Sequence, residues 1–272
     1  MHSPPVVLSI AGSDCSAGAG LQADLKTCAT MGVHCLTAVT AVVAETPVKV
    51  SSIQAMSPEL VCEQVALLLQ GYPVNAIKTG MLGSAAQIEA LADLLAKEQA
   101  PLVVDPVLVA STGDSLSSDD AVEAYQSRLI PVARVVTPNF PEACALLGVD
   151  EVEGLSPRDL AEALAERFQV DILLTGGHAE GRDRATDILV ERGMTHILRG
   201  DWIDCPSSHG TGCTLSAALS AGLASGMHLL DAASQAKEFV TRALRDHYTW
   251  PDSPGLLALN QLPNKNLFDQ GD

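Results

Sequence analysis

The amino-acid sequence predicts an α/β fold in which helices cover both faces of one mainly parallel β-sheet. Short apolar runs alternate along the chain with amphipathic stretches, which is the order that strand–helix–strand units produce. The runs are almost continuously apolar, as strands are when both faces of their sheet are covered. With 272 residues, 47% of them hydrophobic, the chain can bury a full core. We expect one domain over residues 1–272, with a loosely ordered tail from about residue 252.

The predicted strands are six apolar runs, each far shorter than the ~20 residues of a membrane-spanning helix. They cover residues 6–10, 35–43, 75–78, 102–105, 134–137 and 171–174. The predicted helices are recognised by apolar residues three and four positions apart, as at Leu21, Leu25 and Cys28, and by proline at first-turn positions. These helices cover residues 19–31, 58–70, 84–97, 119–129, 141–147, 157–168, 212–225 and 230–247.

Charge and cysteine usage restrict the class of protein. The formal net charge is −17 and the chain has no basic run, so nucleic acid and anionic membrane surfaces are not expected partners. A phosphate ligand would have to be held by backbone amides, a metal ion or a few well-placed cations. The seven cysteines include no C-x-x-C pair, and residues 1–5 do not begin a secretory signal. A cytoplasmic enzyme fits these features best.

Small and polar residues follow the predicted strands. Ligands of parallel sheets bind outside the carboxyl ends of the strands, so these residues are candidates for function. Their enrichment in glycine, aspartate, threonine and asparagine suits a phosphate and metal site, although loops in general share this composition. The segments are residues 12–14, 45–46, 79–81, 105–106, 138–139 and 175–177.

Residues 208–216 contain the most specific motif. Gly210 and Gly212 bracket Thr211 directly before a predicted helix. Glycines allow a ligand close to the backbone, and the unpaired amides at a helix start bind anions. Cys213 would lie at this helix start, where a thiol pKa is lowered. A plain glycine turn with a buried small residue is the alternative.

Residues 12–24 contain the pattern G-x-G-x-x-A, so a dinucleotide-binding oxidoreductase is also considered. In that fingerprint the first glycine closes the turn directly after the strand, whereas seven residues separate Ile10 from Gly18. The acidic residue expected about 20 positions later is poorly placed too. The small residues here are better explained by a flat ligand packed against the backbone.

Two acidic residues are candidate metal ligands. Asp105 ends an apolar strand, where an acid can hold Mg²⁺ or orient a nucleophile, but it also suits the turn before a proline. Glu142 lies in the first turn of a predicted helix, where the helix dipole alone can explain it. His178 and His209 are possible proton carriers or simply structural residues.

Taken together, these segments resemble the ribokinase-like superfamily and, within it, the hydroxymethylpyrimidine/phosphomethylpyrimidine kinases of thiamine biosynthesis. The matching motifs span most of the chain in the family's order. They are I-A-G-S-D-C-S-A-G-A-G-L-Q-A-D-L-K-T (10–27), T-G-M-L (79–82), V-D-P-V (104–107), T-P-N-F-P-E-A (137–143), G-G-H (176–178) and H-G-T-G-C-T-L-S-A-A (209–218).

The resemblance implies a ribokinase-like three-layer sandwich that phosphorylates a hydroxymethylpyrimidine and then its monophosphate, with ATP as co-substrate, Mg²⁺ as cofactor and a homodimer as the assembly. It places Gly12, Ala19, Asp24, Val43, Glu45, Met81 and Val107 around the pyrimidine. It assigns Asp105 and Glu142 to the metal, and Asn139, Gly176, Gly177 and Thr211 to the nucleotide. It makes the anion hole from Gly210, Thr211, Gly212 and Cys213, with the Cys213 thiolate in the place of the aspartate base of sugar kinases.

Two residues depart from the family pattern. Glu45 stands where the family commonly has glutamine, and Thr175 stands where a lysine commonly precedes Gly-Gly-His. A carboxylate offers only hydrogen-bond acceptors, so Glu45 would suit a ring protonated beside its amino group, or a different ring. A pyridoxal kinase of the same superfamily is therefore the first alternative. A pyrimidine-binding regulatory protein that has lost phosphoryl transfer is the second, because position 175 lacks the cation.

Overall fold

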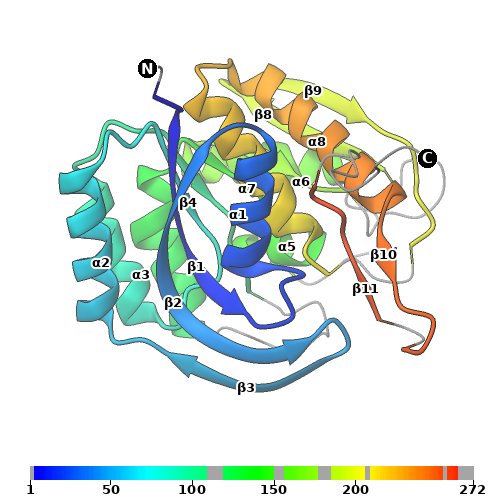
Figure 1. Cartoon of the computed structure of the whole chain (residues 1–272). Coiled ribbons are helices and arrows are strands. Elements are labelled where there is room, and N and C mark those ends of the chain that lie inside the picture. The colour runs from blue at the N-terminus through cyan, green and yellow to red at the C-terminus, as the bar shows by residue number, and fades with distance from the viewer. Residues whose placement is uncertain are drawn as a thin grey trace.

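The computed structural model describes residues 3–108, 119–149, 156–176, 185–205, 209–253 and 256–262. Within these ranges one nine-stranded sheet runs through the molecule in the order β3-β2-β1-β4-β5-β6-β7-β8-β9 (Figure 1). Six neighbouring strands are parallel, which confirms the predicted sheet and its six strands. They are β1 (Val6–Asp14), β2 (His34–Thr46), β4 (Ala76–Thr79), β5 (Leu102–Val104), β6 (Val135–Val136) and β7 (Asp171–Leu174).

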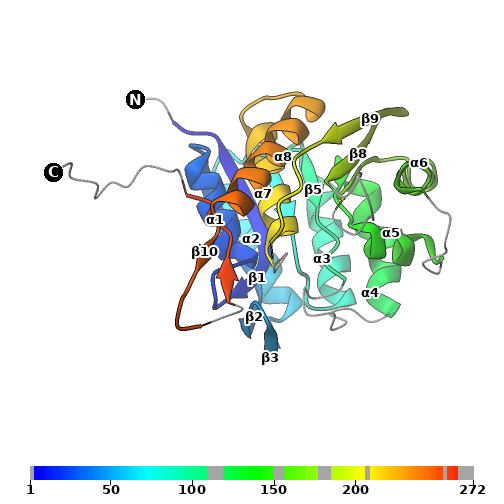
Figure 2. The ribbon, with the colours of Figure 1, turned by 90° about the vertical axis from the view of Figure 1, so that its right-hand side faces the viewer.

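Helices cover both faces of this sheet and complete the predicted three-layer sandwich (Figure 2). One face packs against α1 (Gly20–Thr30), α7 (Thr211–Ala224) and α8 (Leu229–Arg245). The other face packs against α2 (Pro58–Gly71), α3 (Ala85–Leu95), α4 (Asp119–Ala124), α5 (Phe140–Leu147) and α6 (Pro157–Phe168). β1 and β4 to β7 are buried on both sides, which explains their continuous apolar character, whereas β2 also has exposed residues.

Local signals explain where several helices begin and end. Ser57, Ser84 and Ser156 each accept a hydrogen bond from a first-turn amide of the helix that follows, and proline occupies the first turn of α2 and of α6.

The predicted helix 119–129 is α-helical only in its first part. After α4 it continues as a π-helical turn, Tyr125–Leu129, and a 3-10 turn, Ile130–Val132.

Two antiparallel additions at the sheet edges were absent from the sequence prediction. β3 (Lys49–Ala55) pairs with β2, and its mostly exposed side chains explain why it lacks an apolar run. β8 (Thr186–Glu191) and β9 (Met194–Arg199) form a hairpin beside β7. Positive φ angles of 48° at Arg192 and 77° at Gly193 are those of a two-residue hairpin turn. That dipeptide was the signal by which this hairpin could have been predicted.

The prediction of a loose tail is wrong for residues 256–262. β11 (Leu257–Ala258) pairs with β10 (Tyr248–Thr249), and Leu257 and Leu259 are buried. The Gln261 side-chain amide donates to the Thr214 hydroxyl at 3.2 Å, which anchors the segment to α7. In the part of the chain that the structure describes, no helix has both the length and the apolar character needed to span a bilayer.

The carboxyl ends of the parallel strands form one continuous edge. The amides of Gly80, Asp105 and Thr137 donate, each at 2.9 Å, to carbonyls of the neighbouring strand, which are those of Ile10, Thr79 and Val104 respectively. Residues that follow β4, β5 and β6 are therefore held side by side. α7 packs against β1, β4 and β5 on one face of the same sheet. This arrangement brings the post-strand residues and the 208–216 motif to one place.

Candidate active site

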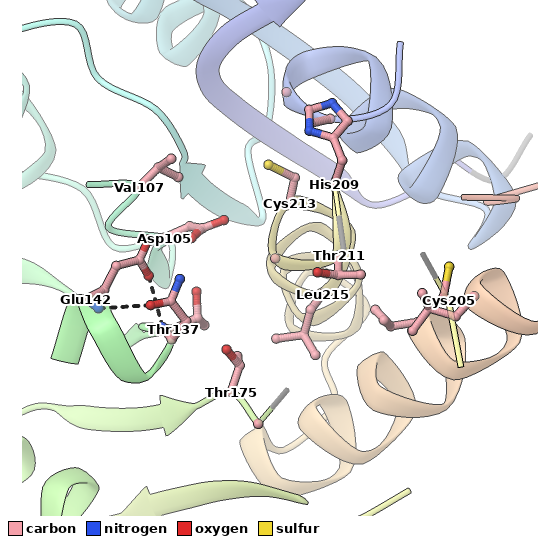
Figure 3. A pocket seen from close by; sticks show the side chains of 18 of the residues that line it. Asp105, Val107, Thr137, Glu142, Thr175, Cys205, His209, Thr211, Cys213 and Leu215 are labelled. Atoms are coloured by element: carbon pink, nitrogen blue, oxygen red, sulfur yellow. Dashed lines mark hydrogen bonds between the residues drawn. The ribbon is translucent and has the colours of Figure 1, made fainter. Parts of the chain in front are cut away.

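A cavity of about 560 Å³ opens at this edge (Figure 3). It collects predicted site residues from seven separate segments of the chain, as expected for post-strand loops of a parallel sheet. Their individual roles stay predictions, and Gly177 and His178 lie outside the described residues. The predicted residues that line the cavity are Gly12, Ala19, Val43, Glu45, Met81, Asp105, Val107, Asn139, Glu142, Gly176, Gly210, Thr211, Gly212 and Cys213.

Asp24 does not line the cavity, so its predicted place beside the pyrimidine is wrong. Its side chain is completely buried beneath the cavity. The Lys78 ammonium donates to both carboxylate oxygens at 2.8 Å, and the Ser9 hydroxyl donates at 2.6 Å. A carboxylate with three such donors is satisfied within the protein and has no need of a ligand.

Lys78 is a site residue that the sequence prediction overlooked. It is fully buried in β4, and its ammonium interacts electrostatically with Cys213 and Asp105 as well as with Asp24. The signal was present in the sequence, because a lysine inside a short apolar strand requires a buried counter-charge. Which acid supplies that charge could not be known from the sequence, since Asp24 is 54 positions away.

Gly12, Val43 and Met81 form a narrow slot at one end of the cavity. A Cβ atom added to Gly12 would lie 3.3 Å from Met81 Sδ and 3.8 Å from Val43 Cγ2. The Thr40 hydroxyl donates to the Met81 carbonyl at 2.6 Å and holds that residue in place. Gly12 therefore packs directly against Met81 and Val43 at this wall, and the flat ligand predicted beside the small residues of the first loop stays a prediction.

Glu45 is half-buried at the mouth of this slot. Burial and the nearby Asp14 carboxylate raise its pKa, while His209 acts in the opposite direction. Its carboxylate has no hydrogen-bond donor among the residues that the structure describes. A carboxylate in this situation favours a ligand that presents N–H groups.

The 208–216 motif forms the start of α7, as predicted. Gly210 is the N-cap residue with a φ of 84°, and a Cβ atom there would lie 2.0 Å from the Gly18 carbonyl oxygen. Only glycine fits this position. The amides of the first turn lack acceptors within the helix and carry the positive end of its dipole. With Thr211 and Gly212 they stand at the cavity wall, and their predicted role as an anion hole stays a prediction.

Cys213 does not have the lowered pKa predicted from its place at a helix start. Its crowded surroundings desolvate a thiolate, and the carboxylates of Asp105 and Asp24 repel one, so the pKa rises to about 12. Lys78 and the hydrogen bond from the Gly20 amide act in the opposite direction but do not prevail. In the free protein Cys213 is therefore a thiol at neutral pH.

Asp105 and Glu142 lie beside each other at the cavity wall, and Asp105 is next to α7, the helix that carries Cys213 (Figure 3). Asp105 is buried, and the Ser216 hydroxyl donates to its Oδ2 at 2.8 Å. Burial and the Asp105 charge raise the pKa of Glu142 to about 8. Glu142 also forms a capping box with Asn139, in which each side chain accepts a 2.9 Å hydrogen bond from the other's backbone amide. The structural explanation of Glu142 is thus correct, but it leaves two crowded carboxylates, of which Asp105 interacts with a Lys78 ammonium that is also paired with Asp24.

The far end of the cavity is apolar and is lined by Trp202, Ile203, Leu215, Val240 and Leu244. No sequence pattern distinguished these residues from ordinary core or surface positions. Their gathering depends on how the segment after β9 crosses α7 and α8. The size and apolar character of this end suit a nucleotide base.

Gly176, shortly after β7, also lines the cavity. Its amide donates to Asp187 Oδ1 at 2.7 Å, and a Cβ atom on it would lie 2.2 Å from the Thr186 carbonyl oxygen. Lys237 from α8 pairs with Asp187 Oδ2 at 2.8 Å and also lines the cavity. Lys237 therefore places a cation at the cavity wall near Gly176, although the lysine common at position 175 in the family is replaced by threonine.

Comparison with known proteins gives consistent matches over most of the chain. The family model described as phosphomethylpyrimidine kinase matches residues 14–256. The hydroxymethylpyrimidine/phosphomethylpyrimidine kinase of Streptomyces coelicolor is 42% identical over 242 residues, which are 89% of each chain. Among solved structures, the ADP complex of Bacillus subtilis pyridoxal kinase superposes with a TM-score of 0.85 at 33% identity, covering 95% of this chain and 98% of that one. Phosphomethylpyrimidine kinase of Clostridium difficile gives a TM-score of 0.76 at 32% identity, covering 88% and 98%.

Proposed function

The chain belongs to the phosphomethylpyrimidine kinase family, and on that premise we propose that it phosphorylates 4-amino-5-hydroxymethyl-2-methylpyrimidine and then its monophosphate in thiamine diphosphate biosynthesis, using ATP. The observation that carries the proposal is one continuous cavity with a flat slot, an anion hole and an apolar nucleotide end. A ring in the slot presents its hydroxymethyl arm toward the anion hole. The γ-phosphoryl group of ATP would reach the same point from the other side.

The transfer is an in-line substitution at phosphorus. The hydroxymethyl oxygen forms a bond to the γ-phosphorus, the bond to the bridging oxygen of ADP breaks, and the hydroxyl proton is released. The first-turn amides of α7 stabilise the charge on the transferring group, because they are already oriented and need no rearrangement. Cys213 lies at this point, and its thiolate form, a minor species at neutral pH, is the candidate acceptor of the proton.

Asp105 and Glu142 fit a magnesium ion. Burial raises the pKa of both carboxylates, and the Asp105 charge raises that of Glu142 further. The buried Thr137 hydroxyl at the cavity wall has no partner among the described residues. Hard oxygen donors of this kind are the ligands that Mg²⁺ prefers. When bound there, the ion would neutralise charge on the ATP phosphates. Without such a cation, this acidic end of the cavity would repel the nucleotide.

The proposal is tested by incubating the protein with MgATP and a panel of small hydroxymethyl heterocycles, with the products read by mass spectrometry. We expect mono- and diphosphate of the aminopyrimidine. ADP formed without any phosphorylated ring, or ligand-induced thermal stabilisation with no ADP formed, would contradict the proposal. The second of those results is what a regulatory pyrimidine-binding protein would give.

Pyridoxal phosphorylation is a second candidate activity, and the similarity to Bacillus subtilis pyridoxal kinase over 95% of this chain supports it. Both substrates are flat rings with a hydroxymethyl arm, so the slot alone does not separate them. Competition between the two compounds in the same assay does. The pyrimidine is preferred if Glu45 binds an amino group together with a ring N–H.

Glu45→Gln should change how pyrimidine binding depends on pH. The Glu45 carboxylate can accept two parallel hydrogen bonds from a ring protonated beside its amino group, so the complex holds a proton between carboxylate and ring. Above the pKa of free Glu45 and of the free ring, this proton must be taken up from solution on binding. In that pH range we expect the wild-type KM for the pyrimidine to rise by up to about tenfold per pH unit. The glutamine variant binds the neutral ring and should show a flat profile. Identical profiles for the two proteins would reject the protonated ring.

Assembly and location follow from the same family resemblance. We propose a homodimer that acts in the cytoplasm. Seven cysteines without disulfide partners, one of them at the reaction point, support a reducing compartment.

A further inference from the structure

His209 joins the pyrimidine slot to the anion hole. It is 5% exposed and directly precedes Gly210, the N-cap residue of α7. Its Nε2 lies 3.0 Å from Asp14 Oδ2, at the end of β1. Hydrogen bonds from His209, Ala19 and Ser16 outweigh the effect of burial and lower the pKa of Asp14 to about 2, so the carboxylate is an acceptor and Nε2 carries the hydrogen.

The two loops also touch through their glycines, with no space between them. A Cβ atom on Gly18 would lie 2.7 Å from His209 Cδ2, and one on Gly210 would lie 2.0 Å from the Gly18 carbonyl oxygen. Contacts this short leave no room for either loop to slide past the other. The His209 side chain therefore sets the spacing of the two loops, and a side chain that cannot make its contacts removes that constraint.

Asp14 connects His209 to the rest of residues 12–20, which we call the pyrimidine loop. Its carboxylate accepts hydrogen bonds from the amides of Ser16, Gly18 and Ala19 at 2.7–3.0 Å. Ala19 lines the cavity, and the next residue, Gly20, donates its amide to the Cys213 sulfur. His209 is thus connected to Cys213 by its hydrogen bond with Asp14, by the hydrogen bond of Asp14 with the Ala19 amide, and by the hydrogen bond of the next residue, Gly20, with Cys213.

A cation site is a weaker explanation of this cluster. Ligand atoms of Asp14, Glu45 and His209 lie within 4.8 Å of one another. However, Asp14 Oδ2 already has four hydrogen-bond partners, which are the amides of Gly18 and Ala19, the Ser16 hydroxyl and His209. A cation would have to displace these contacts and open the loop.

We propose that the His209–Asp14 pair is a positioning device that holds the pyrimidine loop against the anion hole, so that the substrate hydroxyl and the γ-phosphoryl group meet in line. This inference rests on the proposed function. His209 acts here through the two loops and is not assigned contact with the reacting atoms. The position of the pyrimidine loop matters for kcat because phosphoryl transfer requires aligned reactants, and a displacement of about 1 Å can lower the rate roughly 100-fold.

The test compares two amide variants that differ only in reach. The side-chain amide of His209→Gln extends about as far as Nε2 and can donate to Asp14, whereas that of His209→Asn is one methylene shorter. We expect His209→Gln to keep most of the wild-type kcat. His209→Asn and His209→Leu should lose about 100-fold in kcat, with little change in the KM for ATP. The ratio of ADP formed to ring phosphorylated should also rise in the two impaired variants, because a misaligned hydroxyl lets water compete.

Lys26→Met is the matched control. The Lys26 ammonium donates to the Ala17 carbonyl at 2.6 Å, so it supports the same loop without reaching the anion hole. This variant should lower Tm while keeping kcat and the ADP ratio near wild type. Equal kcat in His209→Asn and wild type, or a loss that His209→Gln shares, would overturn the inference. A wild-type protein that phosphorylates no ring would instead overturn the proposed function and, with it, the premise of the inference.

Discussion

Replacing Cys213 with alanine should lower kcat by about 10²- to 10⁴-fold, the range that a positioned acid–base group contributes. The thiol lies at the start of α7 and is the candidate acceptor of the hydroxyl proton. Nucleotide binding should change little, because the apolar end and Gly176 remain intact. Steady-state kinetics together with ADP titration separate the two effects. Unchanged turnover would remove Cys213 from the mechanism.

The pH dependence gives this prediction a second, independent readout. The pKa of Cys213 is raised to about 12, so at pH values well below 12 the fraction of thiolate increases about tenfold with each pH unit. With the pyrimidine saturating, wild-type kcat/KM for ATP should therefore climb between pH 7 and 10 without levelling. The alanine variant should lose that slope. A wild-type profile that levels near pH 7 would show that another group accepts the proton.

Replacing Asp105 with asparagine should reduce kcat by about 100-fold and raise the Mg²⁺ concentration needed for half-maximal rate. Asparagine has nearly the same shape and can still accept the hydrogen bond from Ser216, so the change removes charge and little else. A bound ion contributes several kcal/mol of charge stabilisation, and each 1.36 kcal/mol is worth about tenfold in rate. The measurement is a Mg²⁺ titration at fixed ATP.

Asp171→Asn is the control for this change. Asp171 is another buried strand aspartate, but it begins β7 and pairs with Arg134. It stands at the amino end of its strand, away from the cavity edge. Its replacement should lower stability without altering the Mg²⁺ requirement. If Asp105→Asn kept the wild-type rate and Mg²⁺ requirement, Asp105 would be only a turn residue.

Several features were predictable because their causes lie close together in the chain. The six parallel strands appear as apolar runs, and the starts of α2 and α6 appear as serine–proline pairs. The glycines at the start of α7 marked that helix start, whose unpaired amides carry the predicted anion hole. The two hairpins were missed because β3 is exposed on both faces and the Arg192-Gly193 turn was not considered.

Other features depended on residues that are distant in the chain. Asp24 was placed beside the ring, yet Lys78 holds it beneath the cavity. Cys213 was expected to have a lowered pKa from its helix position, yet burial and two distant carboxylates raise it. The apolar end of the cavity had no sequence signal, because its five residues come from three separate segments.

The sequence by itself determined the alternation of strands and helices and the set of residues that follow the strands, because side-chain periodicity, caps and glycine turns act over a few positions. Only the tertiary structure decided which of those side chains face the cavity and what charge they carry. Burial and Coulomb interactions depend on partners brought together by folding, such as Asp14 and His209, which are 195 positions apart.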